Sequence, residues 1–278
     1  MNATDHPDNK TTANLTVYSQ NVADADSDSV TNITDWRIDG SSMAVLNMPF
    51  DTNESSTDTG AIRDYSTNEN NGTLKGSASG EMATWLSDSM VGGAYDFEGT
   101  GGSTSEGYCI VIEDSESLDI YQNITISFWY KPSDSDAHAL IDKYSGGCSG
   151  PYEIYNTGGT LNWRIKNSTG QCETLSASAL SIGDWNFVTT RYNGTHKTIY
   201  VNGVQKAIAS KTGALAQNNY PVAIGCTVYD TGVPKAYFVN GTLDQIKIYN
   251  SSISEEQINA SYQAGLANHS VQTIVSQE

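Results

Sequence analysis

Short apolar runs in which every second residue is polar recur along most of the chain, and this period of two is typical of β-strands. At 124–130, for example, Ile124, Ile126 and Phe128 can face one side of a strand while the intervening residues face the other. Asn202 and Gly203 follow a similar run and favour the positive φ angles of a tight hairpin turn. Many short strands joined by Gly and Asn turns predict an all-β fold, an antiparallel two-sheet sandwich. We expect strands at 43–50, 94–97, 108–112, 124–130, 139–144, 152–155, 161–165, 185–192, 198–201, 221–228, 235–239 and 242–249.

One helix is predicted near the C-terminus. Ser254 begins the segment Ser-Glu-Glu-Gln, in which Ser254 and Gln257 can each satisfy the other's backbone N–H group. Ile258 and Tyr262 follow on one helix face, and Gly265 is expected to end the helix. The sequence therefore predicts one short helix that closes an end of the sandwich. A tail at 266–278, with a strand-like run at 271–275, should follow it.

The first 42 residues differ from the rest because they are mostly polar. They contain two candidate strands, at 15–19 and 30–38. Two strands alone are not stable in water, so they must pack on the main domain, belong to a larger module or pair with another chain. We therefore divide the chain into an extended N-terminal β arm or partial immunoglobulin-like module at 1–42, a sandwich at 43–265 and the tail.

The charge balance narrows the possible partners. The formal net charge is −18, with only 14 Lys and Arg residues among 278. Such an acidic protein is repelled by nucleic acid and by anionic membrane surfaces, so neither is expected as a partner. No apolar run approaches the length of about 18 residues that a membrane-spanning helix needs.

Asn-x-Ser/Thr sequons occur more often than the composition alone would produce. The thirteen sequons begin at Asn2, Asn9, Asn14, Asn32, Asn53, Asn71, Asn123, Asn167, Asn193, Asn240, Asn250, Asn259 and Asn268. Each is an acceptor for an N-glycan if the protein is exported. The alternative is that a surface rich in Asn, Ser and Thr produces sequons by accident. We expect a glycosylated extracellular or cell-surface protein that carries covalent N-glycans.

Four cysteines suit an oxidising environment. Cys148 and Cys172 flank two apparent hairpin strands, and an antiparallel hairpin brings its outer ends together. We therefore predict a Cys148–Cys172 disulfide, which leaves Cys109 to pair with Cys226. The cysteine spacing is not that of a zinc site.

A series of segments along the chain suggests a family. The segments are Leu46–Phe50, Asp64–Gly72, Gly93–Phe97, Ser117–Asp119, Ile124–Pro132, Gly183–Val188, Ile199–Gly203 and Gly241–Tyr249. In this order they resemble the laminin-G-like, concanavalin A-like jelly-roll domains of secreted proteins, which implies two packed antiparallel sheets of about six or seven strands each. The preceding Asp35–Gly40 is similar to the end of an immunoglobulin-like strand that leads into such a domain in archaeal and bacterial surface proteins.

Catalytic signals are absent from the sequence. Glycoside hydrolases of this fold carry paired carboxylates as Glu-x-Asp-x-x-Glu, and no such motif occurs. The nearest cluster contains Glu113 and Glu116, which a strand would place on opposite faces. No nucleophile elbow or phosphate-binding loop occurs either. We expect a protein that is not an enzyme.

Calcium is the cofactor that the family resemblance implies, as one structural ion near a rim of the sandwich. Asp64, Ser66 and Asn68 present alternate oxygen side chains, as a hard cation requires. Asp96 and Asp244 match positions at which the family's strand motifs carry a recurring Asp. The alternative is that Asp64 and its neighbours only cap a tight turn by binding backbone N–H groups.

The resemblance also implies sugar recognition, which would use exposed aromatic residues beside polar groups. The candidates are Tyr144, Tyr152, Tyr155, Trp163 and Tyr229. Tyr and Trp also fill ordinary sandwich cores, so burial is the competing interpretation.

Taken together, these features predict a structural subunit. Its N-terminal arm, and its tail, would exchange or pair strands with other copies of the chain to form a fibre or surface layer. The alternative is a calcium-dependent carbohydrate-binding or adhesion module of a larger secreted protein.

Overall fold

The structure is a computed structural model that describes residues 2–3, 15–16, 32–54, 56–77, 80, 82–103, 106–143, 148–229 and 231–275. The chain divides into two units, Met1–Thr34 and Asp35–Glu278. In the first unit, β1 (Asn2–Ala3) pairs with β2 (Leu15–Thr16). The other candidate strand of the arm contributes β3 (Arg37–Ile38), which pairs with β4 (Ser41–Ser42) in the second unit. Most of the remaining arm lies outside the described residues.

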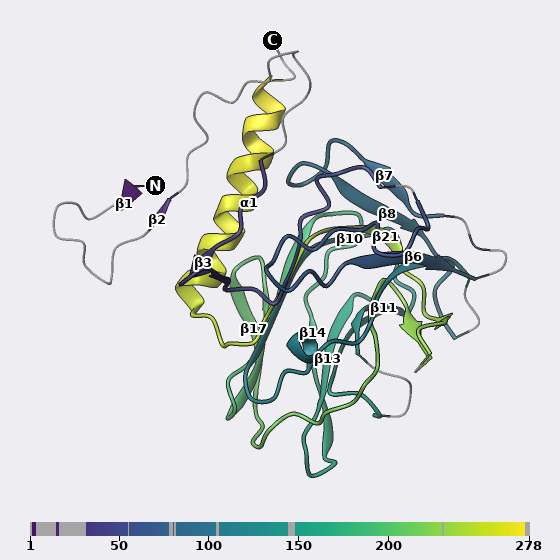
Figure 1. Cartoon of the computed structure of the whole chain (residues 1–278), viewed down its shortest axis with the longest axis vertical. Helices are drawn as coiled ribbons and strands as arrows, with labels where there is room; N and C mark the ends of the chain where they lie inside the picture. Colours follow the sequence, from purple (N-terminus) through teal and green to yellow (C-terminus); the bar gives the residue numbers. More distant parts are fainter. Residues whose placement is uncertain are drawn as a thin grey trace. The chain divides into compact units, whose positions relative to one another are not determined.

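The second unit contains a large antiparallel sheet (Figure 1). Its strand order is β17-β16-β15-β10-β21-β8-β7, and β5 also pairs with β21. The strands are β5 (Leu46–Met48), β7 (Thr84–Leu86), β8 (Ala94–Glu98), β10 (Ile124–Pro132), β15 (Asn186–Tyr192), β16 (His196–Val201), β17 (Val204–Ser210) and β21 (Asn240–Tyr249). We call it the eight-stranded sheet.

A seven-stranded antiparallel sheet packs against it, in the order β14-β13-β12-β11-β18-β9-β6. Its strands are β6 (Gly72–Gly76), β9 (Tyr108–Ile112), β11 (His138–Asp142), β12 (Tyr152–Thr157), β13 (Thr160–Lys166), β14 (Cys172–Ser178) and β18 (Val222–Ile224). A short hairpin, β19 (Thr227–Val228) with β20 (Pro234–Ala236), and a 3₁₀ turn at Glu116–Leu118 complete the β part. The predicted antiparallel two-sheet jelly roll is confirmed.

The main core lies between the two sheets and follows from the alternation of the strands. Ile126, Phe128 and Leu243 from the eight-stranded sheet are fully buried with Ile154 and Trp163 from the other sheet. Burying each such side chain contributes about 1.5–3 kcal/mol, an upper estimate because the unfolded chain is itself partly compact.

Helix α1 (Glu255–Val275) covers the outer face of the eight-stranded sheet (yellow in Figure 1). The predicted capping box is confirmed: Ser254 N–H donates to Gln257 Oε1 at 2.8 Å, and Gln257 N–H donates to Ser254 Oγ at 3.2 Å. The expected end at Gly265 is wrong, as is the strand-like tail, because the helix continues to Val275. A Cβ at Gly265 would lie 2.6 Å from the Trp129 ring, so this glycine permits close packing instead of ending the helix.

Both predicted disulfides are present. Cys148 pairs with Cys172, and Cys109 with Cys226, with Cα–Cα distances of 6.0 and 5.7 Å. The Cys109–Cys226 bond belongs to a small buried cluster that includes Val228 and Phe238. This cluster holds the β19–β20 hairpin against the outer face of the seven-stranded sheet beside β9 and β18.

Within the two large sheets, four strands were not predicted: β6, β7, β14 and β17. The last two form sheet edges and are mostly exposed. A strand with solvent on one side needs no continuous apolar face, so the alternation of apolar and polar residues is weak in β14 and β17. The hairpin turn that leads into β17 is as predicted, with φ of 54° at Asn202 and 73° at Gly203.

Candidate ligand-binding site

A pocket of about 430 Å³ opens on the outer face of the seven-stranded sheet, beside the β19–β20 hairpin. Strands β11, β12 and β13 supply its floor, and the hairpin segment supplies one wall. Its lining residues are Ala137, His138, Ala139, Glu153, Tyr155, Asn156, Thr157, Arg164, Thr227, Lys235 and Tyr237. Charged, amide and aromatic side chains thus converge in one concave site.

The strand register explains why polar groups gather there. Asp142 pairs with Glu153, Glu153 with Arg164, and Arg164 with Thr174, so the four residues form a row across β11, β12, β13 and β14. Residues directly opposite on antiparallel strands point to the same face. The adjacent residues Ile141, Ile154 and Trp163 belong to the core, so the row lies on the outer face.

Arg164 is the centre of the hydrogen bonding in this row. Its Nη1 donates to Glu153 Oε2 at 2.7 Å, and its Nη2 donates to the Tyr155 hydroxyl at 3.1 Å. The guanidinium carbon lies 4.9 Å from the centroid of the Tyr155 ring. These contacts use the planar fork and the cation–π interaction that distinguish arginine from lysine. They fix Tyr155 at the edge of the pocket.

Two buried carboxyl groups lie next to this arginine. Burial raises the pKa of Glu153 to about 7, although Arg164 opposes the shift. Asp142 is completely buried, and neither of its carboxyl oxygens has a hydrogen-bond partner among the described residues. Burial, and then the charge of Glu153, raise the pKa of Asp142 well above its ordinary value. Burial therefore favours the protonated form of Asp142.

The wall of the pocket is held by its own contacts. The two ring nitrogens of buried His138 each lie 2.7 Å from an acceptor, Nε2 from Asp134 Oδ1 and Nδ1 from the Phe238 carbonyl oxygen. Ala139 N–H donates to the Tyr237 carbonyl at 2.9 Å, and Tyr237 N–H donates to the Gly102 carbonyl at 2.8 Å. Tyr237 is held at a φ of 57° by these bonds, with its side chain partly exposed. The pocket is thus built on fixed backbone.

Lys235, on β20, brings a second positive charge to the pocket. Its Nζ lies 5.2 Å from the centroid of the Tyr229 ring, and no carboxylate among the described residues forms an ion pair with it.

The predicted aromatic candidates have different outcomes. Tyr155 lines the pocket, and Tyr229 is exposed beneath Lys235. Tyr152 and Trp163 are wrong as ligand-binding residues, because strand alternation places both in the core. Tyr144 lies outside the described residues.

Several pocket residues were not predicted. Glu153, Arg164, Lys235 and Tyr237 carried no motif, and neither did Asp142 in the neighbouring row. The signal that could have identified Glu153 and Arg164 is a charged residue flanked on each side by an apolar residue within a strand. Such a charge must face outward while its neighbours fill the core.

The geometry around Asp64 agrees with the turn-capping alternative. Asp64 Oδ1 accepts hydrogen bonds from the backbone N–H groups of Asn47 and Ser66, both at 2.8 Å. Its Oδ2 accepts from Ser66 Oγ at 2.7 Å and from Asn70 N–H at 2.9 Å. Asn68 donates to the Val45 carbonyl through its amide nitrogen. These donors occupy the carboxylate oxygens, so the residues do not offer calcium a set of free ligands.

Asp96 and Asp244 are also engaged elsewhere. Asp96 Oδ1 accepts from Thr242 Oγ1 at 2.8 Å, and Asp244 Oδ2 accepts from Val91 N–H at 2.9 Å. Burial is the main cause that raises the pKa of Asp244 well above its ordinary value. Across the described residues, no three His, Cys, Asp or Glu side chains are grouped so that they could hold a metal ion. Calcium binding stays a prediction.

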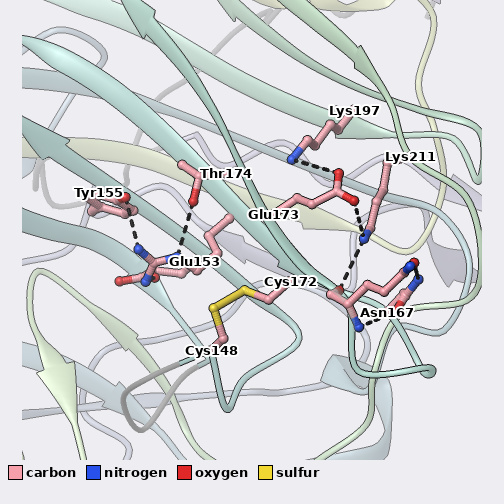
Figure 2. The surroundings of a disulfide bond; sticks show 11 residues. Cys148, Glu153, Tyr155, Asn167, Cys172, Glu173, Thr174, Lys197 and Lys211 are labelled. Carbon is pink, nitrogen blue, oxygen red and sulfur yellow. Dashed lines mark hydrogen bonds and ion pairs between the residues drawn. A yellow bond between two sulfur atoms is a disulfide. The ribbon is translucent and has the colours of Figure 1, made fainter.

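The opposite side of β14 holds a separate cluster, which Figure 2 shows beside the Cys148–Cys172 disulfide. Glu173 lies 3.2 Å from Lys211 Nζ and 3.8 Å from Lys197 Nζ. Burial is the main cause that lowers the pKa of Lys197 to about 8. Because Glu173 and Thr174 are adjacent on the strand, they face opposite ways, and this cluster is not part of the pocket.

The sequence of the chain matches a known protein family. The family model for the concanavalin A-like lectin/glucanases superfamily, of the laminin G type, matches residues 101–259. The chain belongs to this superfamily. This match covers more than half of the chain and includes all the pocket residues. No curated protein sequence matches the chain significantly.

Solved structures share the fold. The binding domain of Paraclostridial Mosquitocidal Protein 1 aligns with a TM-score of 0.58 and 18% identity, over 80% of this chain and 52% of that one. The receptor binding domain of botulinum neurotoxin C/D mosaic serotype aligns with a TM-score of 0.55 and 16% identity, over 80% of this chain and 51% of that one. The ligand binding domain of botulinum neurotoxin serotype D, in complex with N-acetylneuraminic acid, aligns with a TM-score of 0.54 and 16% identity, over 80% of this chain and 51% of that one. This superfamily member therefore spans about half the length of these structures.

At 16–18% identity, these structures show a shared fold. The two disulfides and the laminin G-type domain are consistent with an extracellular location. No helix within the described residues is long and apolar enough to cross a membrane. Assembly into a fibre or layer, an archaeal or bacterial origin and glycosylation stay predictions.

Proposed function

We propose that the protein is an extracellular carbohydrate-binding module and that the pocket beside the β19–β20 hairpin is its binding site. The observation that carries this proposal is the composition of the pocket. Two tyrosine rings, Tyr155 and Tyr237, flank a hollow whose other walls present a carboxylate, a guanidinium and an amide. Aromatic rings pack on the apolar faces of sugars, and fixed polar groups bind their hydroxyls.

The distribution of the Asn-x-Ser/Thr sequons supports the outer face of the seven-stranded sheet as the binding face. No sequon begins between Asn123 and Asn167, although this stretch contains β11, β12 and β13, which form the floor of the pocket. N-glycans on the protein would therefore leave the floor of the pocket accessible. Two structural neighbours of this fold are themselves binding domains, one of a mosquitocidal protein and one of a botulinum neurotoxin. Because only about half of each is shared, the ligand must be inferred from the pocket.

A glycan array tests the proposal with the full chain. Wild-type protein is expected to bind a defined set of glycans, and Tyr155→Ala to reduce that binding at least tenfold, since it removes one stacking surface. Tyr237→Ala should do the same through the other ring. Tyr121→Ala, at an exposed tyrosine outside the pocket, is the matched control and should bind normally. An array without any bound glycan, or equal binding by all variants, would contradict the proposal.

A chelator arm in the same experiment addresses calcium. The lining of the pocket includes a single carboxyl group, that of Glu153, which is too few for a hard cation. Binding is therefore expected to persist in EDTA. Loss of binding in EDTA would restore the calcium-dependent form of the hypothesis.

A further inference from the structure

The pocket differs in charge from the protein that surrounds it. The whole chain has a formal charge of −18, yet the charged side chains that line the pocket are Glu153, Arg164 and Lys235. Glu153 and Arg164 form an ion pair with each other. The ammonium group of Lys235 is therefore the excess charge, and the pocket is locally positive.

We propose that the pocket selects sugars that carry an anionic group, a carboxylate or a sulfate ester, and that Lys235 binds this group. The inference rests on the proposed function and names the class of ligand for that site. An acidic surface repels anions in general, so the choice of an acidic sugar must come from local groups.

The placement of Lys235 fits this role. Its ammonium is held near the Tyr229 ring, which attracts a cation without neutralising it. Its backbone lies on β20, which pairs with β19, and β19 follows the Cys109–Cys226 disulfide directly. Lys235 is thus anchored at the mouth of the pocket while its charge stays available to a ligand. A lysine ammonium suits either a carboxylate or a sulfate.

Asp142 would oppose an anion if it were ionised, because it lies in the same row as Glu153 and Arg164. It is completely buried beneath the pocket region, without a hydrogen-bond partner for either oxygen among the described residues. Burial without a hydrogen-bond partner favours the protonated, uncharged form of this carboxyl group, although Arg164 and Lys235 oppose the shift. Burial therefore disfavours a second negative charge near the ligand.

The experiment compares matched glycans on the array, using the full chain. Glycans that end in a uronic acid, a sialic acid or a sulfated sugar are paired with neutral counterparts. Wild-type protein should bind acidic members at least tenfold better than their neutral partners, and this preference should weaken with added salt. Comparing carboxylated with sulfated glycans decides which anion the site takes.

Lys235→Glu tests the assigned residue. It should abolish the preference for acidic glycans while the protein still binds neutral ones weakly. Lys206→Glu makes the same charge change on exposed β17 of the other sheet, and should keep the preference. Equal binding of acidic and neutral glycans by the wild type, or an unchanged preference in Lys235→Glu, would overturn this inference alone. Binding of no glycan at all would overturn the proposed function as well.

Discussion

The outer faces of the two sheets differ sharply. On the eight-stranded sheet, Trp129, Phe187 and Tyr200 form an apolar surface that helix α1 covers with Ile258 and Tyr262. On the seven-stranded sheet, the corresponding face of β11, β12, β13 and β14 carries the row Asp142, Glu153, Arg164 and Thr174. No helix among the described residues covers that row, and the pocket opens above it.

The difference shows how one sandwich separates stability from binding. An apolar outer face must be covered, and once covered it contributes to folding. A polar outer face can stay in water and is then available to a ligand. Substitutions on the two faces should therefore have different consequences.

The largest effect is expected on the covered face. Trp129→Ala removes a buried ring that contacts Phe187, Tyr262 and Gly265. It should lower the free energy of unfolding by about 3–5 kcal/mol. Denaturant unfolding measures this change. Trp36→Ala, at a partly exposed tryptophan, is the control and should cost far less. Equal losses of unfolding free energy in both variants would show that the packing of α1 on the sheet adds little to stability.

A smaller effect is expected on the open face. Arg164→Met leaves the buried carboxylate of Glu153 without its partner, and should cost about 1–3 kcal/mol. The double variant Arg164→Met with Glu153→Gln removes both charges and should recover most of this loss. Denaturant unfolding again provides the measurement. Failure of the second substitution to restore stability would mean that Arg164 acts through packing alone.

The sequence predicted the core between the sheets and the start of the covering helix better than the open face. Alternation in 124–130 places Ile126 and Phe128 in the core, and the capping box locates the start of α1. Gly265 misled the prediction because its close contact with Trp129 depends on tertiary packing. The hairpin argument identified the Cys148–Cys172 disulfide because it uses only local geometry, and the Cys109–Cys226 disulfide followed because only these two cysteines remained.

The pocket could not be predicted to the same extent. Its floor and wall come from segments more than 60 residues apart, as Arg164 and Lys235 show, and only the fold brings them together. Tyr155 and Trp163 look alike as candidates in the sequence. The register between β12 and β13 decides that Tyr155 faces outward and Trp163 faces the core.

The open face should also make stability depend on pH. The pKa of Glu153 is raised to about 7 from an ordinary value of 4.5, so the folded protein binds this proton more tightly than the unfolded chain. Stability should therefore rise as the pH falls through about 7 toward 4.5. The charged or titratable groups that face Glu153 are Asp142, Arg164 and Lys235. Burial also raises the pKa of Asp142, which adds to the same dependence of stability on pH.

Thermal unfolding at about pH 8 and about pH 6 measures this dependence. The melting temperature should be about 2–4 °C higher at the lower pH, and Glu153→Gln should reduce the difference. Burial also raises the pKa of Asp51 to about 6, so some dependence should remain in the variant. A melting temperature that falls between pH 8 and pH 6 would contradict the assignment.

Glycan occupancy gives the subtlest contrast. Asn193 Oδ1 accepts hydrogen bonds from Thr195 and His196 on an exposed turn, which leaves its Nδ2 available for a glycan. Asn167 is buried, and its Nδ2 donates to Gln171 Oε1 and the Thr212 carbonyl. Glycopeptide mass spectrometry of secreted protein should find Asn193 occupied and Asn167 unmodified. The reverse pattern would contradict this accessibility argument.

The most direct test is a crystal structure of the protein with the glycan that binds best on the array. The account predicts ligand density between Tyr155 and Tyr237, with the anionic group of the sugar within hydrogen-bonding distance of Lys235 Nζ. Density at a sandwich rim or on the α1 face, with the pocket empty, would contradict the claim that the open face is the binding face.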